Sequence, residues 1–307
     1  MVGAHRSAVD TTSEIPETGH GRDDGDTTYI LTPIFGTGVS PTERSSSFAK
    51  RFSVMLLAGI PGILALMGYI YLTTPSTAVP TGLSLPLLAV SSGVNSLLIL
   101  VVACLLGTYA APRVGLQSYL TDRVRTGDGI WRRLRPEVGL AVGFGVFGGI
   151  LILLLDVALA PFVAQDLPQS AIGATDPTVA NVLAYAPVRF LYGGITEELL
   201  LRFGLMSSLA FVGWYVTGRR SDGPGSWVMW FAIIIAAVLF GIGHLPALAQ
   251  SVGLTPALIA RTVLLNAIAG VILGWLYWQR SLEAAMVGHA AFHVPLVVLS
   301  LVQVALL

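Results

Sequence analysis

The chain has 307 residues, of which 54% are hydrophobic and only 11% are charged, and its formal net charge is zero. Soluble domains carry about 25% charged residues, so this chain has too few to cover a surface that faces water. The zero net charge also removes the general attraction to nucleic acid, and no nucleic-acid partner is expected. The composition therefore favours a membrane protein.

The first 52 residues differ from the rest of the chain because they are polar, with several Asp and Glu and many Ser, Thr and Gly residues. Such a segment buries too little apolar surface to offset the entropy lost on folding. We predict a disordered tail over residues 1–52 and a transmembrane domain over residues 53–305.

Seven apolar stretches follow this tail. A hydrocarbon core of about 30 Å needs about 20 residues of helix, and all seven stretches are near or above this length. They cover residues 53–73, 84–109, 138–164, 194–217, 227–245, 257–279 and 282–305. A shorter apolar stretch, 178–193, is interpreted as a re-entrant or interfacial helix before the fourth span. The predicted fold class is all-α, a polytopic transmembrane bundle of about seven spans.

Arginine residues alternate between the connecting segments. Loops 110–137 and 218–226 contain arginines, whereas loops 74–83 and 246–256 contain no charged residue. Because cytoplasmic loops are enriched in Lys and Arg, we expect the amino terminus in the cytoplasm and the protein in the cell membrane. No internal repeat is recognisable, which disfavours a transporter built from inverted repeats.

The fourth predicted span begins with Glu197, Glu198 and, one turn later, Arg202. Charged groups in a membrane cost roughly 2.5–3.5 kcal/mol each on insertion scales, so they are candidates for function. Glu198 and Arg202 are four residues apart and can pair on one helix face. Glu197 points about 100° away from Glu198 and lacks such a partner, which suits a general base or acid. The alternative is a structural ion pair with one carboxylate reaching toward the interface.

Three of the five histidines lie in later spans. Phe240 and His244 share a helix face, and two glycines between them permit close approach of another helix. His289 and His293 also share a face, a spacing that can bind a transition metal or present two donors to one oxygen. The alternative for each histidine is a hydrogen-bonded role in helix packing.

Three further charged residues in the apolar stretches, Asp156, Arg189 and Arg261, have no motif around them. We interpret all three as structural residues. They are therefore left out of the set of candidate site residues.

The order Glu-Glu-x-x-x-Arg, Phe-x-x-x-His and His-x-x-x-polar resembles the CAAX protease and bacteriocin-processing family of intramembrane endopeptidases. The segments Gly270-x-x-x-Gly274 and Arg280-Ser281-Leu282 are similar to that family as well. The resemblance covers residues 178–305, which are expected to form a protease-like core. The spans before this core contribute only hydrophobicity.

The resemblance implies a role for each motif residue. Glu197 and His244 would activate a water that attacks the scissile carbonyl, and His289 and His293 would donate hydrogen bonds to the oxyanion. Glu198 and Arg202 would fix the helix that carries Glu197. The expected partners are the lipid bilayer and a peptide or membrane-protein substrate, with or without a prenylated carboxy terminus.

This chain departs from the family where His293 stands in place of the usual asparagine. A histidine can still donate to an oxyanion, but it is also a better metal ligand than an amide. We expect no cofactor to be required. The alternative is a zinc site formed by His244, His289 and His293, which would agree with the metalloprotease label often given to the family.

Two other functions remain as alternatives to an intramembrane endopeptidase. One is a non-catalytic membrane protein of the same fold, with a bacteriocin-immunity or binding role, and the other is a proton-coupled transporter. The predicted spans also place Glu197 near one end of the fourth span and His289 near the opposite side of the membrane. These residues can meet only near the middle of the bilayer, which requires tilted or broken helices.

Overall fold

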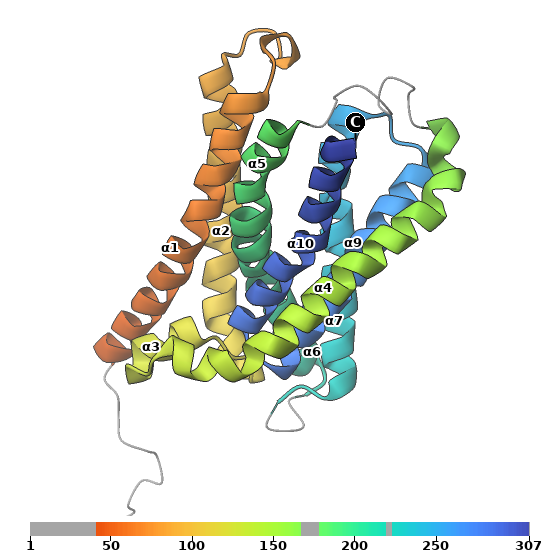
Figure 1. Ribbon diagram of the computed structural model, residues 1–307. Coiled ribbons are helices and arrows are strands. Elements are labelled where there is room, and N and C mark those ends of the chain that lie inside the picture. Colours follow the sequence, from red (N-terminus) through yellow and green to blue (C-terminus); the bar gives the residue numbers. More distant parts are fainter. Residues whose placement is uncertain (1–40, 167–177, 219–222, 307) are drawn as a thin grey trace, which may run out of the picture. The chain divides into compact units, whose positions relative to one another are not determined.

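The computed structural model describes residues 41–166, 178–218 and 223–306, and the unit Ser40–Leu307 is compact. No strand occurs in these described ranges, and seven helical segments are long and apolar enough to cross a membrane (Figure 1). The segments are Ser47–Thr73, Leu85–Val114, Ile130–Asp166, Val179–Val216, Ser226–Gln250, Pro256–Gln279 and Leu282–Leu306. The prediction of an all-α polytopic bundle with seven spans is confirmed.

The helices of the first half differ from the prediction mainly at their ends. Helix α1 covers Pro41–Thr73 and α2 covers Leu85–Ala110, while α4 covers Ile130–Val163. Short 3₁₀ turns, η1 (Ser76–Ala78), η2 (Ala111–Val114) and η3 (Ala164–Asp166), follow these helices. The expectation of a disordered tail was wrong for residues 41–52, which are helical, and residues 1–40 lie outside the described residues. Polar composition misplaced this boundary because a helix can extend beyond the hydrocarbon core.

The arginine-rich loop 110–137 contains a short helix, α3, over Tyr119–Thr126. The Ser118 hydroxyl accepts a bond from the backbone N–H of Thr121, which caps the amino end of α3. At the other end Gly127 takes a φ of 78°, a conformation that glycine adopts at little cost and that ends the helix. The loop is therefore a structured element.

The fourth segment is one continuous helical stretch. It consists of α5 (Val179–Pro187), two π-helical parts, η4 (Val188–Glu197) and η5 (Leu199–Met206), and α6 (Ser207–Val216). The expected re-entrant helix over residues 178–193 is therefore the first half of the fourth span. Pro187, which has no N–H to donate, lies where the π-helical part begins. π-Helical turns are rare and occur frequently at functional sites.

The remaining helices are α7 (Ser226–Gly243), α8 (Leu245–Ser251), α9 (Pro256–Gln279) and α10 (Leu282–Leu306). Helix α10 contacts η4, α9 and α4, and in Figure 1 it lies between the green fourth segment and α9 while α4 crosses it obliquely. Close approach to α4 depends on two glycines. A Cβ on Gly145 would meet the Gly288 carbonyl oxygen at 2.1 Å, and one on Gly149 would meet that of Phe292 at 2.4 Å.

Large apolar side chains cover much of the outer surface. Exposed fractions reach 62% for Leu98, 64% for Leu154 and 73% for Val157, values that would be unfavourable in water. Exposed aromatic residues, Tyr109, Trp131, Tyr215 and Trp227, occur where α2 and α6 end and where α4 and α7 begin. Tyrosine and tryptophan favour membrane interfaces, so this distribution agrees with a multi-pass membrane protein.

Candidate active site

Three of the motif residues form a buried polar group between the fourth segment and α10. The carboxylate oxygen Oε1 of Glu198 lies 3.0 Å from Nη1 of Arg202 and 2.7 Å from Nδ1 of His289. The exposed fractions of the Glu198, Arg202 and His289 residues are 0, 2 and 3%. The predicted pairing of Glu198 with Arg202 is confirmed, whereas the bond from Glu198 to His289 was not predicted.

Glu197 faces the same histidine from the other side. Its Oε2 lies 3.9 Å from Nε2 of His289, and its side chain is 18% exposed. The two adjacent glutamates thus contact opposite nitrogens of one imidazole ring. Glu198 is fully enclosed, while Glu197 retains access to small molecules from outside the bundle.

His244 lies at the end of α7, next to the ring of Phe240. Its Nδ1 lies 2.9 Å from the Phe240 carbonyl oxygen, and the two rings pack edge to face at 4.7 Å. The Phe240 ring also lies 6.2 Å from that of His289, and the Arg202 guanidinium carbon is 5.1 Å from its centroid. Phe240 therefore packs against three of the predicted site residues.

His293 stacks on His289 with ring centroids 5.0 Å apart. Both of its ring nitrogens are buried and have no hydrogen-bond partner within the described part of the chain. Its Nε2 lies close to the backbone of Gly193, where an added Cβ would come within 2.7 Å. Only glycine at position 193 leaves room for the imidazole of His293. The two ring nitrogens of His293 are therefore available to a ligand.

Sequence reasoning did not identify two backbone features of this site. Gly193, inside the π-helical η4, makes space for His293, and the Gly270 carbonyl accepts a bond of 3.3 Å from Arg202 Nη2. Gly270 had entered only as part of the family resemblance. No local pattern marks Gly193, because its importance depends on a contact with a residue on another helix.

A zinc site formed by His244, His289 and His293 would need the three side chains to direct ring nitrogens at one point. Among the described residues, no three His, Cys, Asp or Glu side chains are grouped so that they could hold a metal ion. His289 uses Nδ1 for Glu198, and His244 uses Nδ1 for the Phe240 carbonyl, which leaves Nε2 of each ring without a protein partner of this kind. These two bonds are compatible with metal ligation through Nε2, so only the positions of the side chains disfavour a zinc site.

The continuous fourth segment explains how the motifs meet. Glu197 lies near the middle of Val179–Val216 and not near its start, so its carboxylate can reach His289 on α10. The predicted topology placed Glu197 and His289 near opposite sides of the membrane because it treated residues 178–193 as a helix distinct from the fourth span. The structure includes residues 179–193 in that span.

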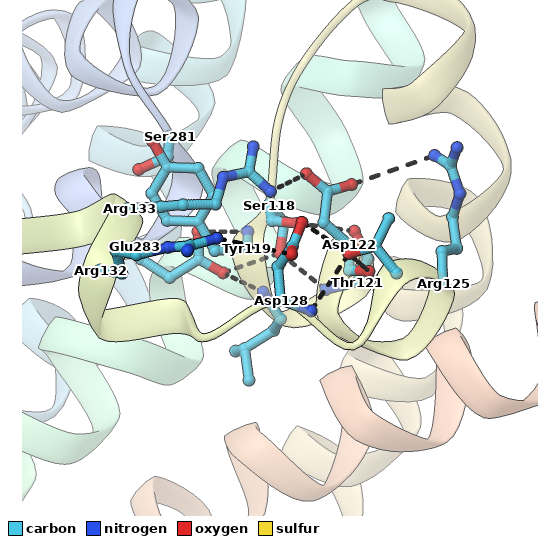
Figure 2. Close-up of polar contacts among 12 residues, drawn as sticks. Ser118, Tyr119, Thr121, Asp122, Arg125, Asp128, Arg132, Arg133, Ser281 and Glu283 are labelled. Carbon is cyan, nitrogen blue, oxygen red and sulfur yellow. Dashed lines mark hydrogen bonds and ion pairs between the residues drawn. The ribbon is translucent and has the colours of Figure 1, made fainter.

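A second buried polar cluster lies at the first turn of α10 (Figure 2). The Glu283 carboxylate accepts bonds from the Ser118 hydroxyl at 2.8 Å and from the backbone N–H groups of Tyr119 and Leu120 at 2.9 Å each. Ser281 and Tyr119 donate to the two oxygens of Glu137 on α4 at 2.6 and 2.7 Å. Glu283 thus satisfies the amino end of α3 and joins it to α10.

The three charged residues without a motif behave differently from one another. Asp156 on α4 forms an ion pair with Arg261 on α9, as a structural role predicts. Arg189 packs over the Tyr185 ring, but its buried Nη1 has no hydrogen-bond partner among the residues that the structure describes. The structural interpretation therefore suits Asp156 and Arg261 better than it suits Arg189.

Comparison with known families matches residues 179–294 to the family described as type II CAAX prenyl endopeptidase Rce1-like. This range includes both glutamates, Arg202 and all three histidines of the site. Comparison with curated proteins and with solved structures gave no match. The resemblance drawn from the three motifs is confirmed over this range.

Proposed function

Residues 179–294 belong to the CAAX protease and bacteriocin-processing family, and from this premise we propose that the protein is an intramembrane endopeptidase. In this proposal it hydrolyses peptide bonds with a water activated by Glu197 and His244. One observation carries the proposal: motifs up to 92 residues apart meet in one group in which Glu198, Arg202 and His289 are bonded and Glu197 faces His289.

The hydrogen bonds assign a proton to one nitrogen of each histidine. A carbonyl oxygen only accepts, so His244 donates through Nδ1 to Phe240 and keeps the lone pair of Nε2 for a water. A carboxylate also only accepts, so Nδ1 of His289 donates to Glu198. Donation from Nε2 of His289 as well requires a ring that carries a proton on both nitrogens.

The proposed reaction begins with a water held between Glu197 and Nε2 of His244. Glu197 takes one proton as the water oxygen attacks the carbonyl carbon of the substrate. The negative charge on the carbonyl oxygen is stabilised by donors from His289 and His293. Collapse of this intermediate breaks the C–N bond, and the proton held by Glu197 passes to the leaving amine.

Glu198 and Arg202 have a positioning role in this proposal. Their ion pair holds the helix next to Glu197, and Glu198 fixes the orientation of the His289 ring. This resembles the general arrangement in which a buried carboxylate orients a catalytic imidazole. In this proposal neither residue contacts the substrate or the attacking water.

We propose that the ends of the helices next to the arginine-rich loops face the cytoplasm. We also propose that the substrate is a membrane-associated protein or peptide. The arginines of α3 and of the start of α4 lie at the same end as the exposed Trp131 and Trp227. A prenyl chain on the substrate would partition into the bilayer and bring the scissile bond to the membrane.

The test is cleavage of a carboxy-terminal CAAX peptide by the full chain in liposomes, with and without a prenyl group. The wild type should release the terminal fragment, and Glu197→Ala should lower the rate by about 10²–10⁴-fold. Asp128→Asn is a control, since Asp128 is an exposed loop carboxylate paired only with neighbouring side chains. A folded wild type that cleaves neither peptide would favour the non-catalytic alternative.

A further inference from the structure

Arg189 differs from the other arginines inside the bundle. Arg202 is paired with Glu198 and Arg261 with Asp156. Arg189 has no carboxylate within ion-pair distance in the described ranges, and its Nη1 is buried without a hydrogen-bond partner there. A guanidinium without an anion is unfavourable within a membrane span, so this position favours a negatively charged ligand.

The guanidinium is held by aromatic side chains. Its Cζ lies 5.1 Å from the centroid of the Tyr185 ring, and Tyr185 in turn packs on Tyr69 of α1 with centroids 4.8 Å apart. The ring lies against one face of the planar guanidinium, and Nη1 at its edge has no hydrogen-bond partner among the described residues. This geometry suits bidentate binding of a carboxylate.

Arg189 also lies at a suitable place relative to the proposed reaction. It is one turn before Gly193, whose backbone adjoins Nε2 of His293. Glu197 follows Arg189 by eight residues. An α-helical rise of 1.5 Å per residue would separate the two positions by about 12 Å along the helix axis, and the wider π-helical turns of η4 make the separation somewhat smaller.

The length of a CAAX terminus fits this spacing. In such a substrate the modified cysteine is followed by three residues and a free carboxylate. Hydrolysis after the cysteine leaves a fragment of at most three residues, which spans about 10 Å when extended. A scissile bond near Glu197 therefore places the terminal carboxylate near Arg189.

We propose that Arg189 binds the free carboxy-terminal carboxylate of the substrate and so sets the distance from the chain end at which this protein cleaves. This inference rests on the proposed endopeptidase function and names the part of the substrate that the site recognises. Arg189 lies toward the Val179 end of the fourth segment, away from the arginine-rich loops. The chain end of the substrate would thus lie beyond Glu197 as seen from those loops.

The experiment uses two CAAX peptides that differ only at the carboxy terminus, one a free acid and the other a carboxamide. With wild type in liposomes, kcat/KM for the acid should exceed that for the amide by about ten- to a hundredfold, the range for hydrogen bonds to a charged group. Arg189→Gln should cleave both peptides at about the amide rate. Arg189→Lys should recover part of the preference, because it keeps the charge but loses the bidentate geometry.

Two results separate failure of this inference from failure of the proposed function. Equal cleavage of acid and amide by the wild type would overturn the role of Arg189 and leave the endopeptidase intact, and this comparison needs no variant to fold. Absence of cleavage of either peptide would overturn the proposed function and the inference together. An Arg189→Gln protein that melts like wild type yet still prefers the acid would also contradict the inference.

Discussion

Two buried glutamates, Glu283 on α10 and Glu198 in the fourth segment, show how the roles of polar groups in this bundle differ. Glu283 accepts from Ser118, Tyr119 and Leu120, so both of its oxygens are engaged. Glu198 uses Oε1 for Arg202 and His289, while its Oε2 is buried without a hydrogen-bond partner among the described residues. Glu283 therefore has a structural role, since its carboxylate is fully hydrogen-bonded. Glu198 belongs to a group in which some buried polar atoms have no partner among the described residues.

Several such buried atoms without a hydrogen-bond partner lie around the candidate site, while others, on Thr108, Asp156 and Arg261, lie elsewhere in the described residues. Both nitrogens of His293 and Nη1 of Arg189 share this property with Glu198. Buried polar groups are nearly always paired, so several unpaired ones in one place indicate a site built for a ligand or a reaction. By the same reasoning, the Glu283 cluster serves to anchor the first turn of α10, the helix that also carries His289 and His293.

The largest effect is expected from the two adjacent glutamates. Glu198→Gln strands Arg202 as an unpaired buried charge, which should lower stability by about 3–5 kcal/mol. Glu197→Gln leaves that ion pair intact, so it should change stability little while lowering turnover by about 10²–10⁴-fold. Thermal melting in detergent and peptide turnover measure both. If Glu197→Gln proved the less stable and the more active variant, the two roles would be reversed.

His293 should respond to the chemistry of its replacement. His293→Asn keeps a donor and should retain much of the activity, whereas His293→Ala should lose about 10²–10³-fold. A zinc site would instead make the Asn variant nearly as damaged as the Ala variant, because an amide is a poor zinc ligand. Turnover of both variants, with metal content per chain, decides between the two. About one zinc per chain with an inactive Asn variant would overturn the metal-independent mechanism.

Glu283 should affect stability more than catalysis. Glu283→Gln replaces one acceptor oxygen by an N–H donor facing other donors, and hydrogen bonds to charged groups contribute about 1.5–3 kcal/mol. We expect a loss of about 2–3 kcal/mol in the free energy of unfolding, with turnover per folded molecule within about twofold of wild type. A melting temperature equal to wild type would show that the cluster does not anchor α10.

Tyr119 should give the smallest effect. Burial and the hydrogen bond to Glu137 raise its pKa to about 12, so the neutral phenol is favoured in the folded protein. Stability from this group is complete below about pH 10 and is lost as pH rises toward 12. Tyr119→Phe should cost about 0.5–1.5 kcal/mol at neutral pH and should reduce that alkaline loss. Melting curves from pH 7 to 12 measure both; a steeper alkaline loss in the variant would contradict the assignment.

Local signals in the sequence were sufficient for a large part of the architecture. Hydropathy alone predicts the seven spans, because each needs about 20 apolar residues whatever its neighbours are. The spacing of Glu198 and Arg202 likewise predicts their ion pair, since both residues lie on one helix. The cytoplasmic position of the amino terminus and the catalytic roles of the site residues remain predictions.

The tertiary structure decided the features that join distant parts of the chain. The bond between Glu198 and His289 joins residues 91 positions apart, and Glu283 lies more than 160 positions from Tyr119 and Leu120. The π-helical fourth segment and the space beside Gly193 were likewise absent from any local pattern. Hydropathy and helical spacing indicate only whether a single segment spans the membrane and which of its residues share a face. The pairing of polar atoms between helices depends on packing, which emerges only when the whole bundle has formed.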